Sequence, residues 1–512
     1  MSVFNRQVLS IAVGLVSLAQ PLLTQQTVPA GDSMLVWRIL LAEDQRDASN
    51  PALTEGSQHP DPRIQVIARR AAARIGDPKF ASRDSFPRLP APPPYADAAW
   101  RLRYRALKAG DCVALRGAFA DSVWAIRLHA IDLATPACAT DSLWIKALIR
   151  WVRTAPPNAA RLAGTASWQP AAHAIVALAR IQPQVARRMV PALARSRIPD
   201  LRVYSARADQ LLGDTTALRN LARDADDNVK EAAIDGLAKV AGHSADDVYL
   251  VTLNARGYQA VRAAARALAG SSRKSEVLNA ALATARRIRD DSSETSRDTR
   301  LALLERVNEH ADAAHATAIA ALAADFDCAV AQAAATIAAR FGPTSGMAPK
   351  CTRLTVRLSP DAVALALGRD VRLRVVIADS SGGGSFVVRL RGDVAPIMAA
   401  RVLELARSHY YDGLTWQRVE PDFVIQGGSP RGNEYVGNPR FIRDELGTVP
   451  HVRGTVGMST RGHDTGDAQW FVNLRDNLRL NSDYTIFGEV VQGIEVIDGI
   501  LEGDVIARIE MI

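Results

Sequence analysis

Two patterns of hydrophobic and polar positions divide the 512-residue chain. Over residues 33–343, apolar residues recur at helical spacing in a sequence rich in alanine, leucine and arginine. From Val371 onward the pattern changes, because Leu373 and Val375 alternate with arginines at the period of a strand with one buried face. The chain is therefore predicted to be multidomain, with an all-α region followed by a separate β-rich domain.

One motif recurs in the helical region. A turn containing Asp, Pro or Asn leads into a helix that begins with an apolar and a basic residue and continues with small ones. Leu201, Val229 and Val261 occupy equivalent positions about 30 residues apart, and Ile64 and Ile126 lie about twice as far apart. A period of this size is typical of a solenoid, in which two-helix units that cannot bury their apolar faces alone stack on one another.

Residues 226–233 (DDNVKEAA) resemble the D-x-x-V-R/K-x-A-A form of a HEAT-type repeat. The resemblance is weak in each repeat but covers the whole region, and it implies a HEAT-like helical solenoid over residues 33–343 that binds a protein partner or client. A rigid spacer without a specific partner is the alternative. Proline-rich stretches at 80–98 and 154–170 are expected to be loops between repeats, and residues 344–369 a linker.

The β-rich domain is predicted over residues 370–512. Its first strand, around Val371–Val375, and a second over Ser385–Leu390 flank the turn DSSGGG, so they are expected to form a hairpin. Residues 395–408 are expected to be helical, begun by Pro396 in the first turn. Short β runs separated by glycine dominate after Leu414.

Residues 1–24 are predicted to be an export signal. Arg6 supplies a short positive segment, an apolar run of about 12 residues follows, and Ser17-Leu18-Ala19 suits a signal peptidase. The run is shorter than the roughly 20 apolar residues of a membrane span. The uncharged stretch continues to Ala30, however, so an uncleaved anchor associated with the membrane is the alternative. The protein is accordingly expected to be periplasmic or secreted.

The chain has four cysteines, Cys112, Cys138, Cys328 and Cys351, and none has the spacing of a metal site. In an oxidising compartment, Cys112–Cys138 and Cys328–Cys351 disulfides would each close a loop of about one repeat. Each would then stabilise the fold by about 3 kcal/mol. Four buried free thiols are the alternative.

The formal net charge of +8 lies entirely in the helical region, since residues 384–512 contain 13 basic and 18 acidic side chains. The arginines are scattered on helical faces without interleaved aromatic residues, which argues against a nucleic-acid partner. A solvated surface and an anionic partner in the cell envelope are the two remaining interpretations.

The candidate chemistry lies in residues 410–428, YYDGLTWQRVEPDFVIQGG. This segment resembles the cyclophilin signature Y-Y-D-G-L-x-F-H-R-V-x-P-x-F-V-I-Q-G-G, with Gln417 in place of the common histidine. Three further segments agree with the family in order and spacing: 453–459 (RGTVGMS), 468–472 (AQWFV) and 484–490 (YTIFGEV). About 140 C-terminal residues thus resemble a cyclophilin-type peptidyl-prolyl cis/trans isomerase.

The resemblance implies a closed eight-stranded β-barrel with two capping helices and a peptide groove on its outer face. It also implies an enzyme that interconverts the cis and trans forms of the bond before proline. The barrier, about 18–20 kcal/mol, comes from the partial double bond of the amide. No bond is broken in this reaction, so no metal or other cofactor is expected, and the substrates are proline-containing polypeptides.

Arg418 matches the catalytic arginine of the family. The prolyl nitrogen gains a lone pair as the amide twists, and a guanidinium aimed at it stabilises that state more than the planar one. Phe423 and Gln426 complete the expected catalytic group, Gln426 by hydrogen bonding to the substrate backbone. The other residues expected to bind substrate are Val424, Met458, Ser459, Thr460, Gln469, Phe471, Leu480 and Tyr484.

Within this set, Met458, Phe471 and Leu480 are expected to form the apolar proline pocket with Phe423, and Tyr484 to close it. Gln469 and the backbone near Ser459 are expected to position the peptide. Each assignment has a structural alternative: a surface ion pair for Arg418, and ordinary core packing for the apolar side chains. The functional prediction is an isomerase acting on exported or cell-envelope proteins. A cyclophilin-like binding protein with weak or no activity is the alternative.

Overall fold

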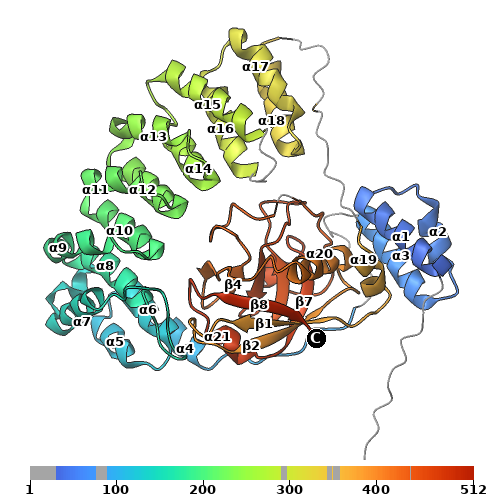
Figure 1. The fold of residues 1–512 in the computed structure, drawn as a ribbon, viewed down its shortest axis with the longest axis horizontal. Helices are drawn as coiled ribbons and strands as arrows, with labels where there is room; N and C mark the ends of the chain where they lie inside the picture. Colours follow the sequence, from blue (N-terminus) through green and yellow to red (C-terminus); the bar gives the residue numbers. More distant parts are fainter. Residues whose placement is uncertain (1–29, 77–88, 290–296, 343–348, 350–357, 439) are drawn as a thin grey trace, which may run out of the picture.

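The computed structural model describes residues 30–76, 89–289, 297–342, 349, 358–438 and 440–512 (Figure 1). The predicted export signal at 1–24 lies outside these ranges. Within them, no helix combines the length and the apolar character that a membrane crossing requires.

The N-terminal region is mostly helical. Three helices come first, α1 (Ala30–Gln45), α2 (Pro51–Ser57) and α3 (Pro62–Gly76). The described residues then form α4 (Trp100–Ala106), α5 (Cys112–Gly117), α6 (Trp124–Asp132), α7 (Ser142–Arg153), α8 (Gln169–Ile181), α9 (Pro183–Leu193), α10 (Pro199–Leu212), α11 (Thr215–Leu221), α12 (Asp227–Val240), α13 (Asp246–Thr252), α14 (Tyr258–Ala267), α15 (Lys274–Arg289), α16 (Arg297–His310), α17 (Ala316–Ala320) and α18 (Cys328–Ala339).

One turn of the repeated motif, at Asp226, caps the helix that follows it, whereas α6, α10 and α14 begin without a side-chain cap. Asp226 accepts hydrogen bonds from the backbone N–H groups of Asn228 and Val229 at the start of α12. Asp327 does the same for the first residues of α18. Each cap satisfies backbone donors that have no partner inside the helix, so the helix starts at a defined residue.

Helices α4–α18, which we call the helical arc, curve around the C-terminal domain (Figure 1). Helix α8 packs on α10, α10 on α12, α12 on α14, α14 on α16 and α16 on α18. Fully buried alanines such as Ala233 and Ala264 lie in this core and let neighbouring helices approach closely. A disulfide joins Cys112 of α5 to Cys138.

That disulfide selects one of the two alternatives left open for this cysteine pair. Cys328 is disulfide-bonded as well, and its predicted partner, Cys351, lies outside the described residues.

Helices α1–α3 do not continue the arc. Their buried residues, among them Ile39 and Ile64, belong to the same hydrophobic core as the C-terminal domain. Helix α1 also packs on α19 (Pro360–Ala366), a helix inside the segment predicted to be a linker. The prediction of one array over 33–343 is corrected in this respect: its first three helices cover the C-terminal domain on the side away from the arc (Figure 1).

In its described residues the C-terminal domain contains one eight-stranded sheet and two α-helices, α20 (Pro396–Arg407) and α21 (Ile494–Asp498). The strands are β1 (Arg372–Ile377), β2 (Ser385–Leu390), β3 (Arg418–Val419), β4 (Val424–Gly427), β5 (Thr455–Met458), β6 (Trp470–Asn473), β7 (Ile486–Gln492) and β8 (Ile506–Met511). They lie in the order β3-β4-β6-β5-β7-β2-β1-β8. The predicted β1–β2 hairpin is confirmed, and α20 begins at Pro396 as expected.

The prediction of a closed barrel is wrong. Strands β3 and β8 are the two edges of the sheet, and the described residues contain no ladder between them, so the sheet is a curled half-barrel. The irregular chain before β3 spans the gap: Trp416 N–H donates to Asp504 O, and Ile506 N–H donates to Leu414 O. Because this segment forms only an isolated bridge there, at Thr415, it adds no ninth strand.

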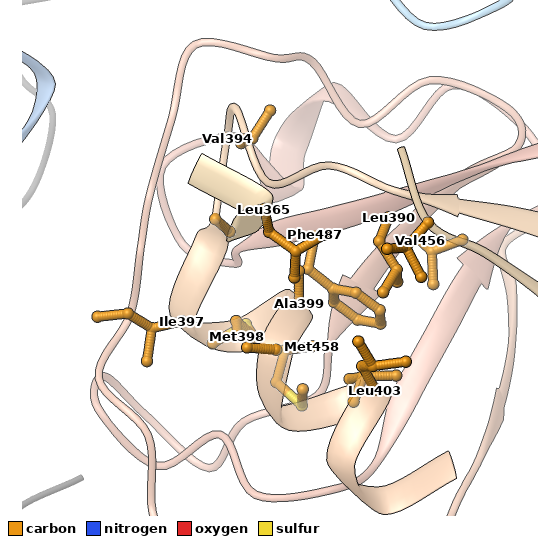
Figure 2. Close-up of a cluster of buried hydrophobic side chains, with 14 of the residues drawn as sticks. Leu365, Leu390, Val394, Ile397, Met398, Ala399, Leu403, Val456, Met458 and Phe487 are labelled. Carbon is orange, nitrogen blue, oxygen red and sulfur yellow. The ribbon is translucent and has the colours of Figure 1, made fainter. Parts of the chain in front are cut away.

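The core of the domain fills the concave side of the sheet. Met398 and Leu403 of α20 meet Val456 of β5 and Phe487 of β7 in a cluster that excludes water (Figure 2). Trp416, also fully buried, packs edge-to-face on Trp470 at 5.1 Å between ring centroids. This core leaves the opposite faces of β3, β4 and β6 free to carry a site.

Candidate functional site

A second, smaller apolar cluster lies apart from the main core. Val424, Phe471 and Leu480 are buried in it, and Phe423 and Tyr484 pack against it while partly exposed. Phe471 and Tyr484 meet edge-to-face at 5.8 Å between ring centroids. The structure therefore brings together four of the five residues predicted for the proline pocket, with Val424 as an added member, in a cluster open to solvent on one side.

The strand pairing and one tight turn explain this arrangement. Strand β4 pairs with β6, which sets Val424 and Phe471 on neighbouring strands. The turn that carries Leu480 is tied down by Asn477, whose Nδ2 donates to Phe423 O at 3.0 Å and to Asn473 Oδ1 at 2.7 Å. These bonds fix the pocket wall to the strand below it.

Met458 does not belong to this pocket. Its side chain lies in the main core beside Met398 and Phe487 (Figure 2). The reason is the period of strand β5: Val456 and Met458 point inward, so Gly457 points outward. A Cβ on Gly457 would lie 2.5 Å from Phe471 Cζ, so the Phe471 ring packs directly on the glycine backbone. The assignment of Met458 to substrate binding is corrected accordingly.

A row of polar side chains runs beside the pocket. Gln426, only 3% exposed, donates from Nε2 to Ser459 Oγ at 2.9 Å and to Gln469 Oε1 at 3.3 Å. Gln469 in turn donates to Val436 O at 3.0 Å, and Gln417 donates to Gln469 Oε1 at 2.9 Å. The three predicted polar residues thus form one connected network, with Gln417 as an added member.

Arg418 lies where the pocket and the polar row meet. It stands opposite Gln426 in the β3–β4 register, and Nη1 donates to Gln426 Oε1 at 3.4 Å. Its guanidinium carbon lies 5.8 Å from the centre of the Phe423 ring, and the side chain is 36% exposed. The guanidinium is therefore beside the apolar slot and accessible to a bound peptide.

Two carboxylates hold that guanidinium. Glu420 accepts from Nε at 2.8 Å and also from Nη2, and Glu434 lies 3.0 Å from Nη1. Sequence reasoning missed both. Glu420 could have been found, because it directly follows strand β3 and residues two apart in an extended segment share a face. Glu434 lies in a loop and carries no local signal.

Thr460 lies farther along the same surface. With Ser459 it lines a small polar pocket that also includes Glu434, Arg461 and Arg297. Arg297 belongs to α16, so the helical arc reaches the flank of the candidate site. Nothing in the repeat pattern predicted this contact.

His451 is a further residue that the sequence did not single out. Its ring is buried and stacks on Phe471, with centroids 6.1 Å apart and planes 20° from parallel. Burial lowers the pKa of His451 to about 4, while its hydrogen bond to Asn481 acts in the opposite direction. The imidazole is therefore neutral near pH 7 and extends the apolar wall from behind.

The site contains no metal-binding arrangement. Across the described residues, no three His, Cys, Asp or Glu side chains are grouped so that they could hold an ion. What the arrangement offers is the partly exposed guanidinium of Arg418, a row of amide groups and an apolar slot, with the exposed Arg479 guanidinium 4.3 Å from the centre of the Phe423 ring.

Comparison with known proteins gives a consistent result. The family described as cyclophilin type peptidyl-prolyl cis-trans isomerase/CLD matches residues 374–510. Peptidyl-prolyl cis-trans isomerase B of Bacillus subtilis is 35% identical over 131 residues, which cover 25% of this chain and 92% of that protein. A peptidyl-prolyl cis-trans isomerase of Helicobacter pylori is 34% identical over 130 residues, covering 25% of this chain and 80% of its own.

A solved cyclophilin type isomerase from Cryptosporidium parvum aligns with 28% of this chain and 98% of its own, at 22% identity and a TM-score of 0.26. The C-terminal quarter of this chain aligns with most of the length of both bacterial relatives. Through that C-terminal domain, the chain belongs to the cyclophilin-type peptidyl-prolyl cis-trans isomerase family.

Proposed function

We propose that this protein isomerises proline bonds of exported or cell-envelope polypeptides, with Arg418 as the catalytic residue and the helical arc as a binding surface for clients. The observation that carries the catalytic part is the position of the Arg418 guanidinium, beside both the apolar slot and Gln426.

The geometry supports a simple mechanism. A proline ring enters the slot between Phe423, Phe471 and Leu480, where apolar burial holds it. Gln426, fixed by its own hydrogen bonds, binds the peptide backbone on one side of the bond that rotates. Arg418 donates toward the prolyl nitrogen as that atom becomes pyramidal. This interaction is absent in the planar ground state, so it lowers the barrier instead of merely tightening binding.

The test is a tetrapeptide isomerisation assay on the full chain. Removing one preorganised donor of this kind costs about 10²–10³ in rate, so Arg418→Ala should lose about that factor in kcat/KM. Arg418→Lys should also be poor, because an ammonium lacks the fixed fork of donors. Arg372→Ala, at an exposed arginine of β1 paired with Asp370, is the matched control and should keep wild-type activity.

Two results would count against the proposal. Full activity in Arg418→Ala would remove the assigned mechanism. An inactive wild-type protein would favour the alternative, a cyclophilin-like domain that only binds.

The cellular location rests on two features. The predicted signal at 1–24 and the Cys112–Cys138 disulfide both fit an oxidising compartment outside the cytoplasm. Cell fractionation with mass spectrometry of the mature N-terminus tests this. A reduced, full-length protein in the cytoplasmic fraction would contradict it, and an intact N-terminus in the membrane fraction would identify the uncleaved anchor.

The client surface rests on where the arc touches the site. In α4, Arg101 donates to Pro421 O at 2.7 Å and Arg105 pairs with Asp422, just before Phe423. On the other flank, Arg262 of α14 donates to Tyr435 Oη at 3.0 Å. A HEAT-like solenoid with this placement would line the approach to the groove from both sides.

Hydrogen exchange with an unfolded proline-rich protein tests the client surface. Protection should appear on the arc as well as on the domain that carries Arg418. Protection confined to that domain would contradict a client role for the arc and leave it as a spacer.

A further inference from the structure

The loop of residues 429–436 connects the helical arc to Arg418. The loop is held in shape by its own side chains, since Ser429 Oγ donates to Val436 O at 2.7 Å. Asn433 Oδ1 accepts from the N–H groups of Tyr435 and Val436 at 2.9 and 3.0 Å. Ser429 and Asn433 are buried, so this shape is not a free surface conformation. Glu434, the residue that meets Arg418, lies between two of these anchored positions.

Helix α12 contacts the loop at Arg431. Asn228 Nδ2 donates to Arg431 O at 3.1 Å, and the Arg431 guanidinium pairs with Asp227 at 3.2 Å. Asn228 is itself oriented by Gln259, a fully buried residue of α14 whose Nε2 donates to Asn228 Oδ1 at 2.9 Å. The contact is therefore built into the core of the arc.

On the other side of Glu434, α14 contacts the loop directly and α16 contacts it through Arg461. Arg262 of α14 donates to Tyr435 Oη at 3.0 Å. Arg461 lies over the Tyr435 ring at 4.2 Å and stands 3.5 Å from both Glu434 and Asp298, a residue of α16. Three helices of the arc thus fix the chain around the Glu434 carboxylate.

The Glu434 carboxylate matters because of its place among the N–H groups of Arg418. A guanidinium has five N–H groups in one plane. Glu420 accepts from Nε and Nη2, and Glu434 lies against Nη1, so carboxylates on two sides set the plane of the group. Nη1 also donates to Gln426 Oε1 beside the groove, so of the five N–H groups one, on Nη2, lies outside these contacts. Holding a reacting group in orientation before the substrate arrives is a direct source of rate.

We propose that Glu434 is a positioning residue for Arg418 and that the helical arc sets its position, so the arc controls the rate of isomerisation as well as binding clients. This inference rests on the proposed function, because it assigns the orientation of the residue proposed to be catalytic. Neither the family signature nor the comparisons assign a role to this loop or to the arc in the reaction.

The first test separates orientation from substrate binding. Glu434→Ala should lower kcat for a proline tetrapeptide about tenfold and leave KM within about twofold, since no side chain of the apolar proline pocket is touched. Glu434→Gln keeps an acceptor oxygen and should recover at least half of the wild-type kcat. Glu510→Ala, at a β8 carboxylate paired with Arg508, is the matched control and should be unchanged. In an Arg418→Ala background, Glu434→Ala should have no further effect.

The second test addresses the arc. Asn228→Ala combined with Tyr435→Phe removes two hydrogen bonds between arc and loop and leaves Glu434 and Arg418 intact. We expect kcat to fall about threefold at unchanged KM, with a thermal midpoint within a few degrees of wild type.

The outcomes are distinct. An active wild type that loses activity in Arg418→Ala, but not in Glu434→Ala, would overturn the role of Glu434 while keeping the proposed function. Glu434→Gln as weak as Glu434→Ala would overturn positioning by contact of a side-chain oxygen with Nη1. A loss in Glu434→Ala with an unchanged double variant would overturn control by the arc. An inactive wild type would instead be a failure of the proposed function itself.

Discussion

Replacing Arg74 with methionine should detach helices α1–α3 from the C-terminal domain. Arg74 is 5% exposed and reaches from α3 across the interface. Its guanidinium donates to Leu446 O at 2.7 Å, Val394 O at 2.6 Å and Glu445 O at 3.1 Å, and to Glu43 of α1 at 2.5 Å. Methionine fills much of the same volume, so the change removes the charge and the donors with little loss of packing.

The size of the destabilisation follows from the buried Glu43 carboxylate that Arg74→Met leaves with fewer partners. Glu43 is buried, which by itself raises the pKa of its carboxyl, but Arg70 and Arg74 outweigh burial and hold that pKa below its usual range. Without Arg74, the Glu43 carboxylate keeps Arg70 at 3.4 Å. Breaking a buried ion pair from one side costs about 3–5 kcal/mol. That is a large share of the roughly 5–15 kcal/mol that stabilises a typical domain.

The assay is hydrogen exchange measured by mass spectrometry on the full chain. Amides of α3 and of residues 393–399 and 444–447 should open more easily by about 3–5 kcal/mol, because these segments meet at Arg74. Arg38→Met is the control: its ion pair with Glu55 is 44% and 52% exposed, and such pairs contribute about 1 kcal/mol or less. Adding Glu43→Gln to Arg74→Met should recover part of the loss, since the unpaired charge is gone. Unchanged exchange in Arg74→Met would refute this account of the interface.

Three further predictions concern the pocket, the disulfide and a buried acid. Gly457→Ala should push the Phe471 ring into the proline slot and lower kcat/KM at least tenfold in the tetrapeptide assay. Replacing both Cys112 and Cys138 with alanine should lower the free energy of unfolding by about 3 kcal/mol in urea denaturation. Asp209→Asn should flatten the pH dependence of stability. Burial raises the pKa of Asp209 to about 7, so between pH 4.5 and 7 the folded state keeps a proton that the unfolded state has released. From pH 4.5 to 8 the free energy of unfolding should therefore fall by about 3 kcal/mol more in wild type than in the variant.

Each of these has a result that would contradict it. Gly117→Ala is the control for the pocket, because a Cβ there meets no atom within 4 Å. Equal activity in both glycine variants would show that the ring has room to move. A disulfide variant as stable as oxidised wild type would mean that the bond adds nothing to the fold. Parallel pH profiles for wild type and Asp209→Asn would place the titrating group elsewhere.

The strand-borne part of the candidate site could be predicted from the sequence because its geometry is local. Arg418 and Gln426 lie in one signature segment, and a two-strand register is enough to set them opposite each other. The same logic shows why Met458 was misplaced. The signature lists residues in chain order, but a strand sends alternate side chains to opposite faces, and Gly457, not Met458, was on the pocket side. Applying the period of two to that segment would have corrected the assignment.

The helical region could be predicted only in its local features. Asp226 caps a helix where the repeat motif placed a turn, since a cap needs only two or three neighbouring residues. The separation of α1–α3 from the arc was invisible, because apolar periodicity says that a helix buries one face but not against what. Ile39 and Ile64 would satisfy the same pattern in an array or on the C-terminal domain.

The least predictable feature is the one that ties the two parts together. Asn228 and Arg431 are separated by 203 positions in the sequence. The hydrogen bond between them ends on the backbone oxygen of Arg431, and every residue type has such an oxygen. Such a bond therefore leaves no recognisable pattern in a single sequence, although it fixes the position of the atoms that it joins. If the arc sets the position of Glu434, the functional coupling passes through contacts of this kind. The repeat region then differs from a tethered spacer in one physical respect: its own packing fixes an atom that Arg418 must meet.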